Sequence, residues 1–135
     1  DARPGFHRLE VTVALPPEPA LRAREVLRAL IHEYLKSGSS HPLAKGSEVK
    51  NVYLLSDGTA VLDLTSALVD GHPSGILEEQ MTIASMVETI SANVSGIHQV
   101  KILVDGKERE TLAGHADLTA VIDVADVNKF VQELQ

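Results

Sequence analysis

Two β-rich runs joined by a short polar turn constrain the fold of this chain more than any other feature. Residues 49–55 and 59–64 are rich in Val, Leu, Tyr and Thr, and the turn between them is Ser56-Asp57-Gly58. An Asp-Gly pair readily adopts the positive φ angles that a tight hairpin turn requires. The sequence therefore predicts a hairpin, in which side-chain alternation places Asp63 on the more exposed face.

Two long segments carry the apolar periodicity of amphipathic helices. Residues 20–38 form an apolar stripe at three- and four-residue spacing, and residues 76–94 form a broader apolar face. Ser74 is predicted to cap the second helix. Glu78 and Glu79 lie in its first turn, where the helix dipole stabilises negative charge without any catalytic role.

The remaining segments complete the expected order of elements. Residues 7–15 alternate as a half-buried strand does, and residues 97–106 form a strongly apolar strand that we expect at the centre of a sheet. The other expectations, in chain order, are a loop over residues 67–75, a short exposed strand over 107–112, a strand or extended arm over 117–124 and a short helix over 125–135.

This order is β-α-β-β-α-β followed by a C-terminal extension. It predicts a two-layer α+β sandwich, with the helices on one face of a mainly antiparallel sheet. A chain of 135 residues is the size of one domain, so we expect a single unit with a core over residues 9–106 and an extension over 107–135.

Composition excludes several classes of partner and site. The formal net charge is −7, and residues 51–100 contain no Lys or Arg, so nucleic acid and anionic lipid surfaces are disfavoured as partners. Aromatic residues make up only 3% of the chain, which leaves few stacking platforms for bases or sugars. The chain has no Cys, which excludes disulfides and thiolate metal sites.

No metal or cofactor site is predicted. The six His residues are spread singly along the chain, and none occurs in an HExxH motif. The Asp-Gly pairs at Asp57, Asp70 and Asp105 lack the alternating acidic ligands of a calcium loop, so we interpret them as corners of the fold. No glycine-rich phosphate loop is present either.

No residue pattern in the sequence is specific for an enzyme. The stretch Gly71-His72-Pro73-Ser74-Gly75 resembles a nucleophile elbow, but its Ser lies one position too late for G-x-S-x-G. We therefore predict no catalytic residues. The alternative hypothesis is a small-ligand or cell-wall glycan binding domain, with weak hydrolase activity, in which His41, His72 and Ser74 provide the ligand loops.

The order and spacing of several motifs resemble those of the GerMN domain, a bacterial sporulation and spore germination domain. The matching features are Gly46, the hairpin segment D-G-T-A-V-L-D-L-T at residues 57–65, E-T-I at 88–90, G-I-H-Q-V at 96–100 and L-V-D-G at 103–106. The resemblance extends over residues 9–106. It implies an α+β sandwich similar to ring-building domains of secretion and sporulation machines, and no catalytic residues.

The resemblance also implies an extracytoplasmic domain in the periplasm or on the outer face of the membrane. Members often follow a lipoprotein signal or one transmembrane helix, so we expect such an anchor upstream of Asp1. The leading hypothesis is a non-enzymatic envelope module that binds an envelope protein, itself or cell-wall material. The carboxylates of Asp70, Glu78 and Glu79 are predicted to form its partner surface.

Overall fold

The computed structural model describes residues 10, 12, 14–36 and 43–134 of the chain. The strand expected over residues 7–15 falls mainly outside these residues. The described members of that stretch, Glu10, Thr12, Ala14 and Leu15, have no regular secondary structure. The first regular element among the described residues is therefore a helix.

Four helices and four strands follow one another along the described chain. In order they are α1 (Pro19–Leu35), β1 (Val49–Leu54), β2 (Thr59–Leu64), α2 (Ser66–Asp70), α3 (Ile76–Asn93), β3 (Gln99–Val104), β4 (Ile122–Asp123) and α4 (Val124–Leu134). The expected helices over 20–38, 76–94 and 125–135 correspond to α1, α3 and α4. The predicted hairpin corresponds to β1 and β2, and the predicted central strand to β3.

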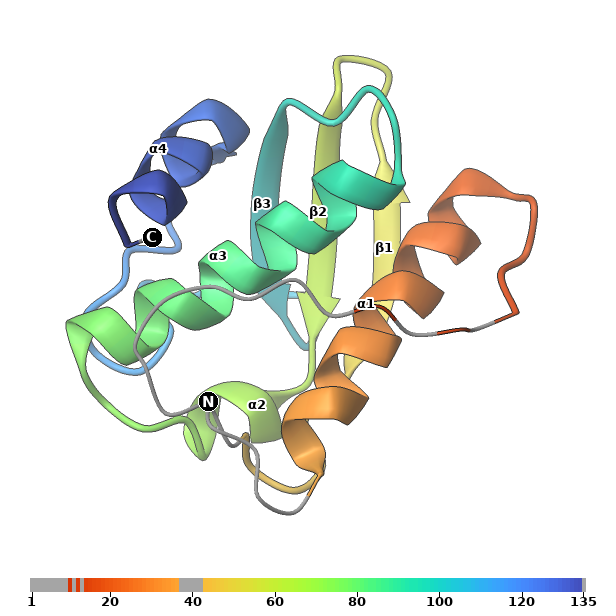
Figure 1. Cartoon of the computed structure of the whole chain (residues 1–135). Helices are drawn as coiled ribbons and strands as arrows, with labels where there is room; N and C mark the ends of the chain where they lie inside the picture. The colour runs from red at the N-terminus through yellow and green to blue at the C-terminus, as the bar shows by residue number, and fades with distance from the viewer. Residues whose placement is uncertain (1–9, 11, 13, 37–42, 135) are drawn as a thin grey trace.

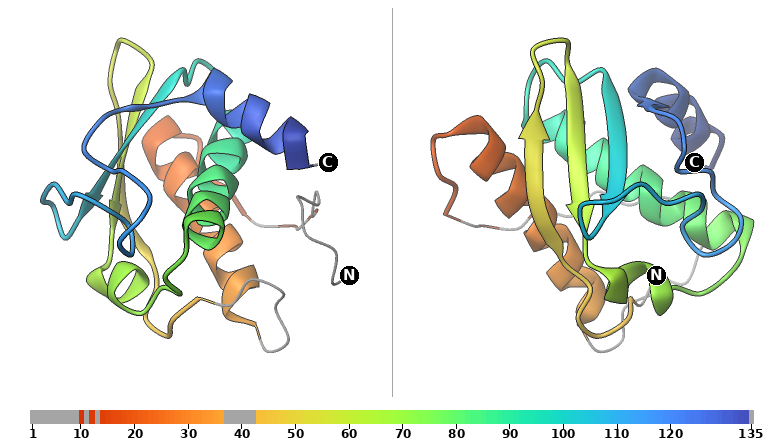
Figure 2. Two further views of the ribbon diagram at one scale, coloured as in Figure 1. Left: turned by 90° about the vertical axis from the view of Figure 1, so that its left-hand side faces the viewer. Right: turned by 180° about the vertical axis from the view of Figure 1, so that it is seen from behind.

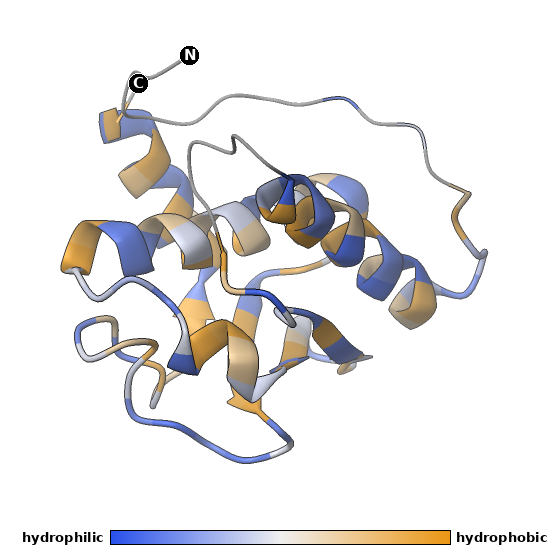
Figure 3. Cartoon of the chain, turned by 90° about the horizontal axis from the view of Figure 1, so that it is seen from below, coloured by the Kyte–Doolittle hydropathy of each residue, from blue (hydrophilic) through white to orange (hydrophobic). Residues whose placement is uncertain are grey.

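The start of α1 is fixed by its local sequence. The Glu18 carboxylate accepts hydrogen bonds from the N–H groups of Ala20 and Leu21 at 3.2 and 2.8 Å, and Pro19 occupies the first helical position. The carboxylate satisfies two of the free N–H groups that a helix start presents, and Pro19 has no backbone N–H that would need a partner. Hydrophilic and hydrophobic residues then alternate along the helix, and its apolar side faces the core (Figure 3).

The sheet has the order β1-β2-β3-β4. β1 pairs with β2 and β3 pairs with β4 in antiparallel fashion, whereas β2 pairs with β3 in parallel from Thr59↔Gln99 to Leu64↔Val104. The parallel pair follows from the crossover through α2 and α3, which returns the chain to the end of the sheet where β2 began. The α+β fold class is confirmed, and its sheet contains this one parallel pair.

The helices α1, α3 and α4 lie on one face of the sheet (Figure 1). The core between these layers is aliphatic. Its fully buried side chains include Leu27 and Ile31 from α1, Met86 and Ile90 from α3, and Leu62, Leu64 and Ile102 from the sheet. Burial of such side chains is the main stabilising contribution in a domain of this size.

The opposite, outer face of the sheet has no long helix over it in the described structure. Viewed from behind, strands β1, β2 and β3 face the viewer and the helices lie beyond them (Figure 2). The segment that follows β3, residues 105–121, crosses this face near the end of β3 before it reaches β4. We call this segment the strap.

The glycine corners predicted from sequence take three forms. Gly58 has φ of +88° in the β1–β2 turn, and Asp105 and Gly106 have φ of +49° and +76° in the turn after β3. These are the left-handed conformations that tight turns require. Gly71 instead ends the short helix α2 with φ of −96°.

Several local predictions are wrong, each because of a tertiary contact. Residues 66–70 are helical rather than part of a loop, since Leu68 and Val69 anchor this turn in the core. Residues 107–112 form no strand, and Lys107 makes only an isolated bridge with Val104. Asp63 is 6% exposed rather than at the surface, because the strap covers it.

Candidate functional site

The most concentrated polar cluster among the described residues surrounds Glu79. Its side chain is 0% exposed, and four backbone N–H groups donate to its carboxylate. Those of Ala113, His115 and Ala116 reach Oε1 at 2.8, 3.0 and 2.9 Å, and that of Gly75 reaches Oε2 at 3.0 Å. The imidazole Nδ1 of His115 lies 2.7 Å from Oε2. We call this arrangement the Glu79 clasp.

The clasp keeps Glu79 ionised. Burial raises the pKa of this carboxyl, but the N–H donors of Ala116, Ala113, Gly75 and His115 outweigh burial and hold the pKa far below its usual range. An ionised carboxylate can only accept hydrogen bonds. Nδ1 of His115 therefore carries a hydrogen atom and donates a hydrogen bond to Glu79. The His115 side chain is 47% exposed.

Ser74 lies at the edge of the clasp. Its hydroxyl donates to the carbonyl of Ala113 at 2.9 Å, and Oγ lies 3.4 Å from Nδ1 of His115. The residue types Ser, His and Glu thus meet in one place, but Ser74 and Glu79 approach the same ring nitrogen. In a catalytic triad they contact opposite nitrogens, so that one accepts the proton while the other is held by the carboxylate. The arrangement of Ser74, His115 and Glu79 therefore differs from that of a catalytic triad.

The predicted cap of α3 is therefore wrong. The N-cap residue is Gly75, without a side-chain cap, and Ser74 bonds to the strap instead. Glu79 accepts the Gly75 N–H from within the first turn. At the N-terminus of α3, the side chain that accepts a backbone N–H thus comes from inside the helix and not from the residue before it.

The predicted ligand loops do not form one site in the described chain. His72 is 6% exposed, with Nδ1 at 2.8 Å from the Pro73 carbonyl oxygen and Nε2 at 2.6 Å from Thr82 Oγ1. Both ring nitrogens are therefore engaged inside the protein, while Ser74 faces the strap. His41 lies outside the described residues.

The predicted partner surface also requires a correction. Asp70 and Glu78 are exposed, and Asp70 lies 3.3 Å from Nη1 of Arg109. Glu79 is buried in the clasp and cannot contact a partner in the folded protein. Because Asp63 is buried too, the acidic residues of the stretch without Lys or Arg do not all reach the surface.

Sequence reasoning did not identify the role of His115 or of the strap. In the sequence, His115 is one of several histidines that are spread singly along the chain. The available signal was the spacing of Leu112, Ala116 and Leu118 around it, since these apolar residues prove to be 0%, 5% and 0% exposed. Such spacing indicates a buried segment, but it does not reveal that Glu79 is the partner.

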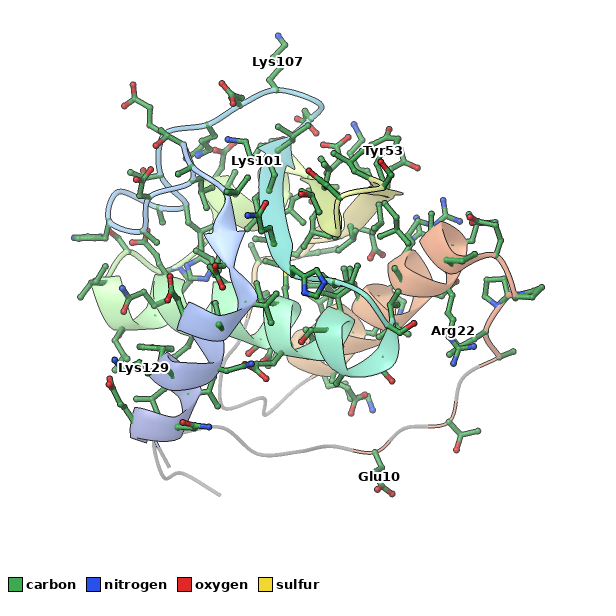
Figure 4. The ribbon with its side chains drawn as sticks, turned by 90° about the horizontal axis from the view of Figure 1, so that it is seen from above. Glu10, Arg22, Tyr53, Lys101, Lys107 and Lys129 are labelled. Carbon is green, nitrogen blue, oxygen red and sulfur yellow. The ribbon has the colours of Figure 1, made fainter. Side chains whose placement is uncertain are left out.

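A second feature is the open part of the outer face beside β1. Tyr53 and Leu55 are 50% and 51% exposed, and Tyr53 stands opposite Val61 in the register of β1 and β2. Tyr53 and Lys101 project from the side of the sheet away from the helices (Figure 4). β1 is an edge strand of the described sheet, so the apolar patch lies next to a strand edge that pairs with no further described strand.

No group of three or more His, Asp or Glu residues is placed to hold a metal ion within the described ranges. None of the helices in the same residues combines the length and apolar character needed to cross a membrane.

Comparisons with solved structures show the same fold in other bacterial proteins. A structure described as "Putative Lipoprotein from Clostridium perfringens" is 22% identical, with a TM-score of 0.65, over 84% of this chain and 71% of that one. The first GerMN domain of the sporulation protein GerM from Bacillus subtilis is 22% identical, with a TM-score of 0.59, over 90% and 96%. At such identities the likeness concerns the fold.

The tandem GerMN domains of the same Bacillus subtilis protein are 24% identical, with a TM-score of 0.58, over 80% of this chain and 38% of that one. Among curated proteins, no match was found. Residues 5–110 match the family described as "Germane: Sporulation and spore germination", which covers most of the chain. This protein therefore belongs to the Germane family of sporulation and spore germination domains.

Proposed function

We propose that this domain is a non-enzymatic assembly or partner-binding module of the bacterial cell envelope, acting outside the cytoplasm. The observation that carries the proposal is the apolar patch of Tyr53, on edge strand β1, and Leu55, which directly follows that strand. Half-exposed Tyr and Leu side chains beside an open strand edge are suited to a protein partner. The partner gains apolar burial from the side chains and hydrogen bonds from the strand edge.

The proposed location and role are supported by the family and by one structural neighbour. The description of the matched family is "Sporulation and spore germination", and the Clostridium perfringens neighbour is described as a "Putative Lipoprotein". A lipid anchor upstream of this chain would hold the domain at the outer face of a membrane.

The alternative of a small-ligand or glycan site around His72 and Ser74 gains no support. Both side chains make hydrogen bonds within the protein, and His72 is buried. A ligand would have to replace these internal bonds before it could bind, which costs free energy.

Solution mass measured by light scattering over a wide concentration range tests the proposal. We expect the mass to rise with concentration and the rise to disappear in a Tyr53→Thr, Leu55→Thr variant. The matched control is Ile76→Gln with Leu77→Gln, because these residues are 49% and 42% exposed at the start of α3, away from the strand edge. The control variant should associate as the unaltered chain does.

If the chain is strictly monomeric, the same variants are compared in pull-downs from envelope extracts. Capture of an envelope protein that depends on Tyr53 and Leu55 would support the proposal.

Charge reversal of the exposed residues, by Asp70→Lys with Glu78→Lys, tests the acidic surface predicted from sequence. The proposal is wrong if neither mass nor capture responds to any of these substitutions.

A further inference from the structure

The strap is held at its start and at its middle by two buried carboxylates from the earlier part of the chain. At its start, the Gly106 N–H donates to Oδ1 of Asp63 at 2.7 Å, and the Asp105 N–H donates to the carbonyl of Leu64 at 2.9 Å. Further along, the turn at residues 113–116 donates to Glu79. Two side chains that sequence reasoning placed at the surface therefore hold this segment in position.

The strap contributes part of the core. Leu112 and Leu118 are 0% exposed, and the Leu118 N–H donates to the carbonyl of Glu110 at 2.8 Å. From the sheet, Lys101 Nζ donates to the carbonyls of Leu118 and Thr119 at 3.1 and 2.8 Å. The Lys101 aliphatic stem and the strap thus close over the β3 side of the outer face.

The helix after the strap is also packed against the core. Val124 and Val127 of α4 are 8% exposed each, and Phe130 and Val131 are partly buried against the same core. The match to the Germane family ends at residue 110. Three of the four N–H groups that satisfy Glu79 lie beyond that point, so a chain ending there would leave a buried carboxylate largely unsatisfied.

We propose that residues 111–134 are an obligatory part of this domain and that the Glu79 clasp locks them to the start of α3. The folding unit of this chain is then larger than the family match. Within it, Glu79 is a positioning residue that holds the strap over the sheet. Its carboxylate serves two elements at once, since Gly75 begins α3 and Ala113, His115 and Ala116 form the turn of the strap.

Glu79→Gln tests this proposal in the full chain, with Glu78→Gln as the matched control. The two residues are neighbours in the same helical turn, but Glu78 is exposed and makes none of the clasp contacts. We expect hydrogen-exchange protection of the Ala113, His115 and Ala116 amides to fall at least about tenfold in Glu79→Gln. Protection in Glu78→Gln should stay within about twofold of the unaltered chain. Equal protection in the two variants would overturn the proposal.

Native-state hydrogen exchange of the unaltered chain gives a second test that needs no variant. If the strap belongs to the folding unit, the amides of Ala113 and Ala116 exchange through the same global opening as those of Leu62 and Ile102. Exchange of the strap through a separate and more frequent opening would show that it is an accessory segment. That result would overturn the proposal even if Glu79→Gln failed to fold.

Discussion

At the scale of single residues, Gly58 shows how closely the hairpin turn approaches the loop before β3. A Cβ atom on Gly58 would lie 2.6 Å from Cδ2 of His98 and 3.0 Å from the carbonyl oxygen of Gly96. The Gly58 carbonyl in turn accepts the N–H of His98 at 2.8 Å. The turn at one end of β2 is thus fastened to the chain that enters β3.

Gly58→Ala is expected to lower the free energy of unfolding by about 2–4 kcal/mol, from backbone strain at positive φ and from the clash with this loop. Gly96→Ala is the control, because Gly96 has φ of +83° but no heavy atom within 4 Å of an added Cβ. It should cost only the strain, about 1–2 kcal/mol. Urea denaturation measures both. Equal losses would show that the close approach contributes nothing.

Glu79 gives the stability of the protein a defined dependence on acid. Its pKa is lower in the folded state than in the unfolded state, so its contribution is complete above the unfolded value of about 4.3 and is lost as the pH falls through the folded value. We expect Glu79→Gln to cost about 2–4 kcal/mol at pH above about 5. The difference from the unaltered chain should shrink steadily below about pH 4.

Denaturant titrations of both chains at a series of pH values below about 5 measure this difference. A difference that does not change down to the most acid pH would contradict the assigned role of the carboxylate.

The clasp could not be predicted from sequence for a physical reason. A carboxylate in the first turn of a helix is already explained by the helix dipole, so nothing local indicates that Glu79 is buried. Its burial depends on a turn at residues 113–116, which reaches it only after the sheet and the strap have formed. The burial of Asp63 could not be predicted either. The alternation of side chains along β2 indicates which face of the sheet Asp63 lies on, but it does not indicate that the strap covers this face.

At the scale of elements, periodicity predicted the two long helices, the hairpin, the strand β3 and the helix α4. These elements have patterns complete within their own residues. The short helix α2 was missed because five residues show no helical period, and only the burial of Leu68 and Val69 holds it. The parallel pairing of β2 and β3 was missed as well, since it depends on where α3 returns the chain.

Neighbouring residues of β2 test the assignment of its two faces. Leu62 is 0% exposed on the helix side, whereas Val61 is half-buried on the outer face opposite Tyr53. Leu62→Ala should cost about 2–5 kcal/mol because it leaves a cavity between the layers. Val61→Ala should cost about 1 kcal/mol or less. Thermal or urea unfolding compares them, and a larger loss at Val61 would mean that the faces are assigned wrongly.

At the scale of the whole molecule, the two faces of the sheet have different roles. Helices α1, α3 and α4 pack on one face across the hydrophobic core, and the strap crosses the β3 side of the other face (Figure 2). The part left open lies over β1 and β2, where Tyr53 and Leu55 are exposed. The strap therefore forms one border of the proposed partner surface. The Glu79 clasp fixes the position of this border because it holds the strap.

The position of the clasp along the chain has a consequence for biosynthesis. A chain emerges from the ribosome N-terminus first, and β1 and β2 can pair as soon as their hairpin is free. Glu79 emerges before residues 113–116, which later satisfy its carboxylate. Until they arrive, the carboxylate must remain hydrated, and the start of α3 cannot settle against its final neighbours. The core of this domain therefore cannot be completed until residues 113–116 have emerged, well after the hairpin and α3 have been made.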